Sequence, residues 1–355
     1  MQKISLDKSW RFTMGETSVN TDLPSSNFTA LLDNGAIPDP FYRDNEKKSL
    51  YISKNDCSYE KSFNLDFDKD NFDKIILRFE RIDCLSEVIF NGETIAETKN
   101  AHVFYEFDST SKVKKGENTI LVKLFSPLNF IEKRQAENPM PNNPNGFNGA
   151  CYIRKPGCNF GWDWGIGLPP SGLENVSIIG YSKIKLNSFD VHQEHFDGKV
   201  RLSFSADFES YSADASLFVE INDGEKTAKV PFEDSYLIEN PVLWWSNGMN
   251  GAKKQKLYCI KLIAEDNGKE LDSISKKIGL RTIYLDRSPD NKGENFCFVL
   301  NGVKIFAKGA NWIPIDAFIT RRTKDDYRYY IESAANANMN MLRVWGGGYY
   351  ETEAF

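Results

Sequence analysis

The sequence predicts a mainly β protein in which two consecutive sandwiches are followed by a strand–helix–strand unit. Short segments that alternate apolar and polar residues fill the chain up to about residue 285, with turn signals between them. Helical spacing of apolar residues appears only after that point. With 355 residues the chain has room for two or three domains, and we expect them at 1–182, 183–285 and 286–355.

The first block reads as a sandwich of the jelly-roll kind. In "SEVIFNGETIA", Val88 and Phe90 alternate with polar residues before Asn91-Gly92, a strong hairpin signal because both positions favour φ > 0. A second alternating stretch, "GENTILVKLFSP", is expected to be a strand closed by Pro127. A polar loop rich in proline, asparagine and glycine is expected between Glu137 and Gly149. Many short strands with such turns are typical of jelly rolls.

The second block has the features of an immunoglobulin-like sandwich. The stretches "KVRLSFSADF", "ASLFVEIND" and "QKLYCIKLIAED" alternate apolar and polar residues at period two. Turn signals lie at Asn222–Gly224 and Asp266–Gly268. About 100 residues of short strands fit this fold.

The last block changes character. A hairpin is expected to turn at Asn301-Gly302, followed by an apolar strand that ends near Gly309. Thr323 can cap a helix whose apolar positions fall at helical spacing, and "MNMLRVWGGG" then predicts a buried strand. Strand, helix and strand form a right-handed βαβ unit, which leaves strand edges open when it stands alone. We therefore expect the chain to be the N-terminal part of a longer protein.

Composition excludes several classes of function. The net charge is −6 and no block of lysine or arginine indicates a nucleic-acid partner. No stretch approaches the roughly 20 apolar residues that span a bilayer, and the N-terminus lacks a signal core, so a cytoplasmic protein or a removed leader is expected. The six scattered cysteines predict reduced thiols in cores, and His192 and His195 are expected to be surface residues rather than metal ligands.

The segment "NFGWDWGIGLPPSG" is the most unusual part of the chain. Its glycines and prolines oppose a helix and a regular strand, yet it places Asp163 between Trp162 and Trp164. Aromatic residues make up 13% of the chain, and such a supply usually serves large cores. Aromatic planes also pack well on the C–H faces of sugars.

Three stretches together resemble the β-mannosidases of glycoside hydrolase family 2. They are "GWDWGIGLPPSG", "FAKGANWIPIDAF" and "NMNMLRVWGGGYYE", and the similarity extends from "LDKSWRF" through "IGLRTIYL". Sister β-galactosidases and β-glucuronidases lack the Trp-Asp-Trp loop, and exo-glucosaminidases tend to replace the Trp-Gly-Gly that begins here at Trp345. The resemblance implies a sugar-binding jelly roll, an immunoglobulin-like domain and the first strands of a (β/α)8 catalytic barrel.

The resemblance also implies an exo-β-mannosidase that retains configuration, acts on a β-mannoside oligosaccharide or glycan, and needs no metal or organic cofactor. A retaining glycosidase uses two carboxylates about 5–5.5 Å apart. In the family both glutamates come from later barrel strands, so they are expected beyond Phe355, and these 355 residues alone are expected to be inactive. For Glu351 and Glu353 we expect solvated or structural loop roles.

Family resemblance assigns sugar contacts to the Trp-Asp-Trp loop. The Asp163 carboxylate would accept hydrogen bonds from two sugar hydroxyls, which would exclude analogues that lack them. Trp162 would form a wall against the sugar ring, whereas Trp164 is expected to be a core or interface anchor. The alternative is that both tryptophans anchor an interface and Asp163 caps backbone amides.

Four further residues are implied near the ends of the first two barrel strands. Arg343 would orient the nucleophilic carboxylate, and Trp345 would contact the bound sugar. Asn311 and Asp316 would line the floor of the pocket. The alternatives are a rim salt bridge for Arg343, loop packing for Trp345, and local Asx-turns for the other two.

A second aromatic pair lies in "LWWSNGMNG", where Trp244 and Trp245 are expected to pack in a core or interface. Two competing functions stay open at this point. One is a non-catalytic carbohydrate-binding module that uses the jelly roll by itself. The other is a sister glycosidase acting on β-glucosaminides or β-galactosides.

Overall fold

The computed structural model describes residues 1–141, 147–212, 214–250 and 255–355. Within them the chain forms two compact units. The N-terminal unit consists of residues 2–180, 313–328 and 344–355, and the central unit consists of residue 1, 181–312 and 329–343. Segments of the range 286–355 thus belong to both units, and the three domains expected from the sequence stay a prediction.

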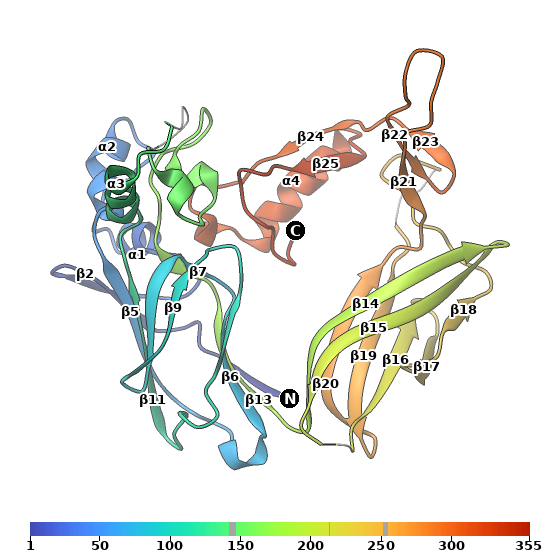
Figure 1. Ribbon diagram of the computed structural model, residues 1–355, viewed down its shortest axis with the longest axis horizontal. Coiled ribbons are helices and arrows are strands. Elements are labelled where there is room, and N and C mark those ends of the chain that lie inside the picture. The colour runs from blue at the N-terminus through green and yellow to red at the C-terminus, as the bar shows by residue number, and fades with distance from the viewer. Residues whose placement is uncertain (142–146, 213, 251–254) are drawn as a thin grey trace. The chain divides into compact units, whose positions relative to one another are not determined.

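The N-terminal unit is a β-sandwich (Figure 1). Its six-stranded sheet has the order β3-β2-β5-β11-β8-β9: Thr17–Thr21, Trp10–Met14, Cys57–Asn64, Glu117–Leu124, Leu85–Phe90 and Glu93–Lys99. The four-stranded sheet has the order β1-β13-β6-β10: Gln2–Ser5, Val176–Tyr181, Lys74–Phe79 and Tyr105–Asp108. A small sheet has the order β4-β12-β7: Ser25–Ser26, Gly172–Leu173 and Ile82–Asp83. One hydrophobic core draws on these sheets, which confirms the predicted sandwich.

The predicted hairpin at Asn91-Gly92 is present between β8 and β9. Both residues have positive φ, at 53° and 88°, as a tight hairpin turn of this kind requires. Val88 and Phe90 on β8 are fully buried, as the alternation predicted.

Among the described residues of this first block, α-helices are present at α1 (Asn27–Asp33), α2 (Asn45–Ser53) and α3 (Pro127–Glu137). They gather at one end of the sandwich (Figure 1). The strand expected in this stretch is present as β11, but it ends at Leu124, before Pro127, and Pro127 opens α3, a helix that the sequence analysis did not predict. The Ser126 side chain caps this helix by accepting from the Asn129 amide at 3.0 Å, and proline fits a first helical turn. Of the loop predicted at 137–149, residues 142–146 lie outside the described residues.

The central unit contains the predicted immunoglobulin-like sandwich. One sheet has the order β14-β15-β18: Ile184–Phe196, Lys199–Ser210 and Tyr236–Ile238. The other has the order β17-β16-β19-β20: Thr227–Pro231, Ser216–Asn222, Tyr258–Asp266 and Lys269–Ile278. The turn signals at 222–224 and 266–268 both lie between paired strands, and one apolar core lies between the sheets.

The remaining strands form two small sheets. One has the order β21-β22-β23: Ile283–Asp286, Cys297–Leu300 and Val303–Ile305. The hairpin predicted at Asn301-Gly302 is present in it. The other pairs β24 (Gly309–Trp312) with β25 (Met341–Val344).

Two expectations for these last strands were wrong. The strand expected to end near Gly309 begins there, and β25, expected to be buried, has partly exposed and exposed residues only. Among the described residues β24 and β25 pair only with each other, so no further strand covers their edges. The apolar sequence of β25 predicted burial that this pair by itself does not provide.

Helix α4 (Lys324–Asn336) connects these two strands. Its cap follows the prediction: the Thr323 hydroxyl accepts from the Asp326 amide at 3.2 Å, and the Asp326 carboxylate accepts from the Thr323 amide at 2.8 Å. Such a reciprocal arrangement satisfies two of the backbone donors that a helix N-terminus leaves open.

All six cysteines are free thiols. Cys57, Cys84 and Cys158 lie in cores as predicted, whereas Cys151 and Cys259 are exposed, contrary to the prediction. In the described parts of the chain, no helix has the length and apolar character needed to cross a bilayer.

Candidate carbohydrate site

The Trp-Asp-Trp segment forms a tight turn. The Trp162 amide donates to the Gly165 carbonyl at 3.3 Å, and the Gly165 amide donates to the Trp162 carbonyl at 3.2 Å. Asp163 and Trp164 therefore occupy the two central positions of a four-residue turn. The Asp163 side chain is exposed, while both tryptophans are half-buried. The turn thus presents a carboxylate between two indoles.

Both indoles of this turn contact Trp345, which lies 181 positions after Trp164 in the sequence. The Trp162 and Trp345 rings are 4.7 Å apart between centroids and cross at 72°. The Trp164 and Trp345 rings are 5.8 Å apart and cross at 81°. Edge-to-face geometry of this kind is favourable for aromatic pairs. The structure therefore brings the predicted residues Trp162 and Trp345 together, with Asp163 beside them in the turn.

The backbone that follows Trp345 is hydrogen-bonded to the segment just before the Trp-Asp-Trp turn. The Cys158 amide donates to the Gly347 carbonyl at 3.0 Å, and the Asn159 side-chain amide donates to the Tyr349 hydroxyl at 2.5 Å. The Arg81 guanidinium lies 5.0 Å from the centroid of the Tyr349 ring. Burial raises the pKa of Tyr349, so its hydroxyl stays neutral and able to accept this hydrogen bond.

Cys158 is itself unsuited to nucleophilic chemistry. Burial is the main reason that the pKa of its thiol is raised to about 12. A thiol attacks as its thiolate, and at neutral pH almost none is present at such a pKa.

Glu351 is held in a buried ion pair. Its carboxylate accepts from Arg322 at 2.8 Å and from the Tyr327 hydroxyl at 2.6 Å. The Arg322 and Glu351 side chains are only 4% and 6% exposed. Burial first, and then the hydrogen bond to this carboxylate, raises the pKa of Tyr327, which therefore remains a donor. Of the two roles expected for Glu351, the structural one fits this geometry, whereas Glu353 is exposed.

Asp316 is engaged locally. Its carboxylate accepts from the Phe318 amide at 2.7 Å and from Arg321 Nε at 3.0 Å. Phe318 in turn is fully buried and stacks on Phe28 of α1, with centroids 5.0 Å apart at 14°. The local Asx-turn, the alternative for Asp316, matches these contacts, and the loop that contains it is anchored in the core of the first sandwich.

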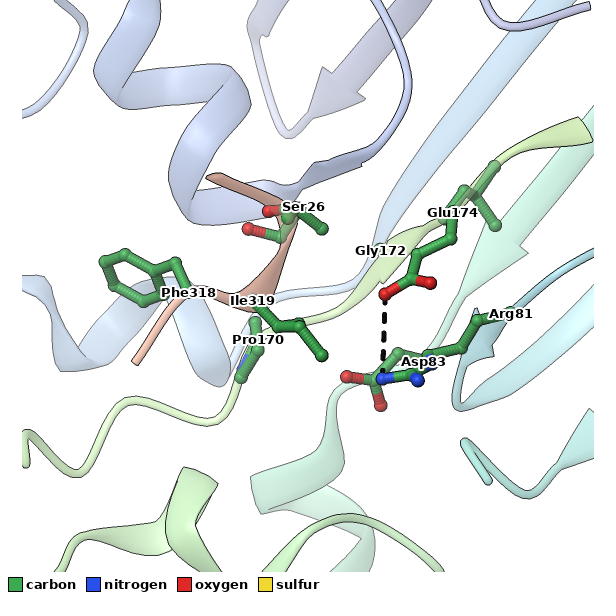
Figure 2. A pocket seen from close by; sticks show the side chains of 10 residues that line it. Ser26, Arg81, Asp83, Pro170, Gly172, Glu174, Phe318 and Ile319 are labelled. Carbon is green, nitrogen blue, oxygen red and sulfur yellow. Dashed lines mark ion pairs between the residues drawn. The ribbon is translucent and has the colours of Figure 1, made fainter. Parts of the chain in front are cut away.

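Close to this anchor lies a pocket that sequence reasoning missed (Figure 2). Arg81 and Glu174 face each other across it as an ion pair at 3.6 Å. Phe318 and Ile319 form part of its apolar wall. None of the residues predicted to bind sugar lines it. Its residues come from short segments that are far apart in the sequence, so no local motif could have revealed it.

The comparisons with known proteins agree along the chain. Residues 10–175 match the profile described as "Glycosyl hydrolase 2 galactose-binding domain-like", and residues 183–281 match "Glycosyl hydrolases family 2". The β-mannosidase of Capra hircus is 33% identical over 99% of this chain and 43% of its own length. The chain belongs to glycoside hydrolase family 2.

Further comparisons extend over almost the whole chain. β-Mannosidase B of Emericella nidulans is 32% identical over 94% of this chain and 41% of its own length. The crystal structure of the β-D-mannosidase of Dictyoglomus thermophilum superposes with a TM-score of 0.92 at 32% identity, over all of this chain and 45% of that one. The chain thus spans less than half the length of these relatives. An exo-chitosanase of Amycolatopsis orientalis, with a TM-score of 0.72 at 18% identity, shares the fold.

The last two predicted residues of this family 2 chain meet in the central unit. Arg343 on β25 donates through Nη1 to the Asn311 side-chain oxygen on β24 at 3.1 Å, and both residues are exposed. Asn311 thereby limits the orientation of the guanidinium.

The two histidines considered as metal ligands make ordinary surface contacts. His192 Nε2 lies 2.9 Å from the Ser205 hydroxyl, and His195 Nε2 lies 3.1 Å from the Gln193 side-chain oxygen. Among the described residues, no three His, Cys, Asp or Glu side chains form a group suited to a metal ion.

Proposed function

We propose that this chain is part of an exo-acting β-mannosidase that removes terminal β-D-mannose with retention of configuration. The observation that carries the proposal is the turn that presents Asp163 between two tryptophans, both in contact with Trp345. The named β-mannosidases that match almost the whole chain support the choice of sugar.

In this proposal the turn binds the terminal sugar. The Asp163 side chain is exposed, and its carboxylate can accept hydrogen bonds from two adjacent hydroxyls. A site built on such hydrogen bonds discriminates strongly, because an analogue without the hydroxyls leaves a polar group unpaired. Trp162 and Trp345 supply aromatic surface for the ring of the sugar. Trp164 supports Trp345 from the side.

Arg343 is assigned to orient the nucleophilic carboxylate, and its hydrogen bond from Nη1 to Asn311 supports a fixed guanidinium. A cation held in place favours the ionised form of a neighbouring carboxylate. The structure gives less support to a role for Asp316 in lining the floor of the sugar pocket, because its oxygens already accept from Arg321 and from the Phe318 amide.

We place the two catalytic glutamates outside these 355 residues. The relatives are more than twice as long as the part of them matched here. Glu351 is committed to Arg322 and Tyr327, so it does not offer the free carboxylate of an acid/base or a nucleophile. The pairing of β24 with β25, with α4 between them in sequence, supports their assignment as the start of a (β/α)8 barrel.

The competing hypothesis of an independent binding module fits the packing less well. Phe318, from a segment far along the chain, is part of the core of the first sandwich. A module that works alone would be expected to complete its core from its own residues.

Hydrolysis of aryl glycosides tests the proposal. The protein extended to the length of its relatives should release p-nitrophenol from the β-mannoside, and proton NMR should detect β-mannose as the first product. The matching β-glucosaminide and β-galactoside should react at least about a hundredfold more slowly. The 355-residue chain should give no turnover above blank. A preference for either other glycoside, or turnover by the 355-residue chain, would contradict the proposal.

A further inference from the structure

The three glycines after Trp345 are not equivalent. A Cβ atom added to Gly347 would lie 2.1 Å from Cη2, 2.3 Å from Cζ2 and 2.6 Å from Cζ3 of the Trp345 indole. These three atoms form the far edge of the six-membered ring. The indole is therefore folded back over the backbone of Gly347, and only a residue without a side chain leaves room for it.

The neighbouring glycine has no such constraint. Apart from its two chain neighbours, a Cβ atom on Gly346 would have no atom within 4 Å, and Gly346 is exposed. Neither glycine has the positive φ that would strain any other residue, so alanine differs between the two positions in space alone.

The indole and the backbone beneath it have little freedom to separate. The Gly347 carbonyl accepts from the Cys158 amide at 3.0 Å, which holds the backbone to the sandwich. The Trp162 and Trp164 rings meet the Trp345 ring at centroid distances of 4.7 Å and 5.8 Å. A methyl group at Gly347 would therefore displace a rigid ring that is already in contact with two others.

We propose that Gly347 is a positioning residue for the sugar site: the absence of a side chain there sets the orientation of the Trp345 indole against the Trp-Asp-Trp turn. The consequence of this inference for catalysis rests on the proposed function. The packing of the Trp345 indole over Gly347, here called the seat, is a property of the 355-residue chain itself. Trp345 is the group that would touch the sugar, and Gly347 acts through it.

Circular dichroism of the 355-residue chain tests the seat. Two indoles whose centroids are 4.7 Å apart couple their transitions, and the Trp345→Phe variant defines the part of the spectrum that depends on this pair. Gly347→Ala should lose most of that part, whereas Gly346→Ala should keep it. An unchanged spectrum for Gly347→Ala would overturn the inference.

The Trp345→Phe background distinguishes a clash between the methyl group added in Gly347→Ala and the indole from a general defect in folding. Phenylalanine lacks the far ring edge that would meet a Cβ atom at Gly347, so the added methyl group should be tolerated there. We expect Gly347→Ala to lower the unfolding midpoint in the Trp345 chain and to change it little in the Trp345→Phe chain. Equal shifts in both backgrounds would overturn the inference, because the cost would then not come from the indole.

Kinetics of the extended protein test the consequence. Gly347→Ala should raise KM for the aryl β-mannoside about tenfold with a smaller change in kcat, since about 1.4 kcal/mol of ring contact corresponds to a factor of ten. Gly346→Ala should stay within about twofold of the parent. An unchanged KM would overturn the positioning role while the parent's hydrolysis still supported the proposed function. A parent inactive on β-mannosides would contradict the proposed function and leave the spectroscopic test of the seat in force.

Discussion

Two tryptophan pairs of this chain look alike in sequence and differ in structure. Trp162 and Trp164 flank an exposed aspartate in a turn, and both contact a ring from the distant segment at Trp345. Trp244 packs within its own sandwich, where its amide donates to the Leu280 carbonyl at 2.8 Å and the Arg281 guanidinium lies 4.7 Å from its ring. The first pair joins segments far apart in sequence, whereas Trp244 contacts the short connection between β20 and β21.

The difference lies in what surrounds each pair. The Trp162 turn carries a polar residue at its tip, so its indoles frame a group that can bind a ligand. The Trp244 stretch has no charged residue between its rings, and the backbone next to it continues into ordinary packing: the Asn301 side chain donates to the Trp244 carbonyl at 2.9 Å. Core or interface packing was predicted for this pair, and the structure confirms packing for Trp244. Gly251, at the end of that stretch, lies outside the described residues.

The largest expected effect concerns the buried ion pair between Arg322 and Glu351, a residue of the segment that follows Trp345. Glu351→Ala should lower the free energy of unfolding by about 3–5 kcal/mol, because it leaves the Arg322 charge buried without its carboxylate. Urea unfolding followed by tryptophan fluorescence measures this. Glu353→Ala, at an exposed position two residues later, should stay within about 0.5 kcal/mol, and similar effects of both substitutions would contradict the anchoring role.

The second prediction concerns the locally packed pair. Trp244→Ala should lower the free energy of unfolding by about 3 kcal/mol, because a large, half-buried ring is removed from its contacts with Gly279 and Arg281. In the extended enzyme the folded fraction should keep its kcat/KM within about twofold. A larger loss of activity without a loss of stability would indicate that Trp244 takes part in substrate binding. The two tryptophan pairs would then not differ in role.

The third prediction reverses this pattern at the turn. Asp163→Ala should lower kcat/KM for the β-mannoside at least about a hundredfold, since hydrogen bonds to a charged group contribute about 1.5–3 kcal/mol each. Because Asp163 is exposed, the unfolding midpoint should barely change. A destabilised variant with normal activity would show that the carboxylate serves the fold.

The smallest effect is the coupling between the rings themselves. A double-mutant cycle of Trp162→Ala and Trp345→Ala should give a coupling free energy of about 0.5–1.5 kcal/mol, the range for aromatic pairs. A cycle of Trp162→Ala with Trp10→Phe, a core residue of the same unit, should be additive within about 0.5 kcal/mol. Equal coupling free energies in both cycles would mean that the direct contact between Trp162 and Trp345 does not stabilise the protein.

Much of the fold followed from local patterns. The alternation around Val88 and Phe90 and the turn at Asn91-Gly92 depend only on neighbouring residues, and the structure contains both. The helix at Pro127 was missed because a proline after a strand has two meanings: it can end one element or open the next. The burial of β25 was overestimated because an apolar run fixes what a strand prefers, not which neighbours it receives.

The site divides in the same way. The motifs implied, through their resemblance to the β-mannosidases, that Trp162, Asp163 and Trp345 contact one sugar. They left open whether Glu351 is solvated or structural, since the ion pair that decides this depends on Arg322, 29 positions earlier. The requirement for glycine at Gly347 was equally invisible, because three consecutive glycines look the same until the indole is placed.

The sequence by itself determined the strands, their turns and the presence of an aromatic turn with a carboxylate, because period-two alternation and glycine conformations are properties of adjacent residues. Only the tertiary structure decided which ring the turn meets, which carboxylate is neutralised in the interior and which glycine the indole covers. These outcomes depend on contacts between residues that are distant in sequence, by 29 positions for Arg322 and Glu351 and by 181 for Trp164 and Trp345, or on the volume around a single side chain. Neither is encoded in a local pattern.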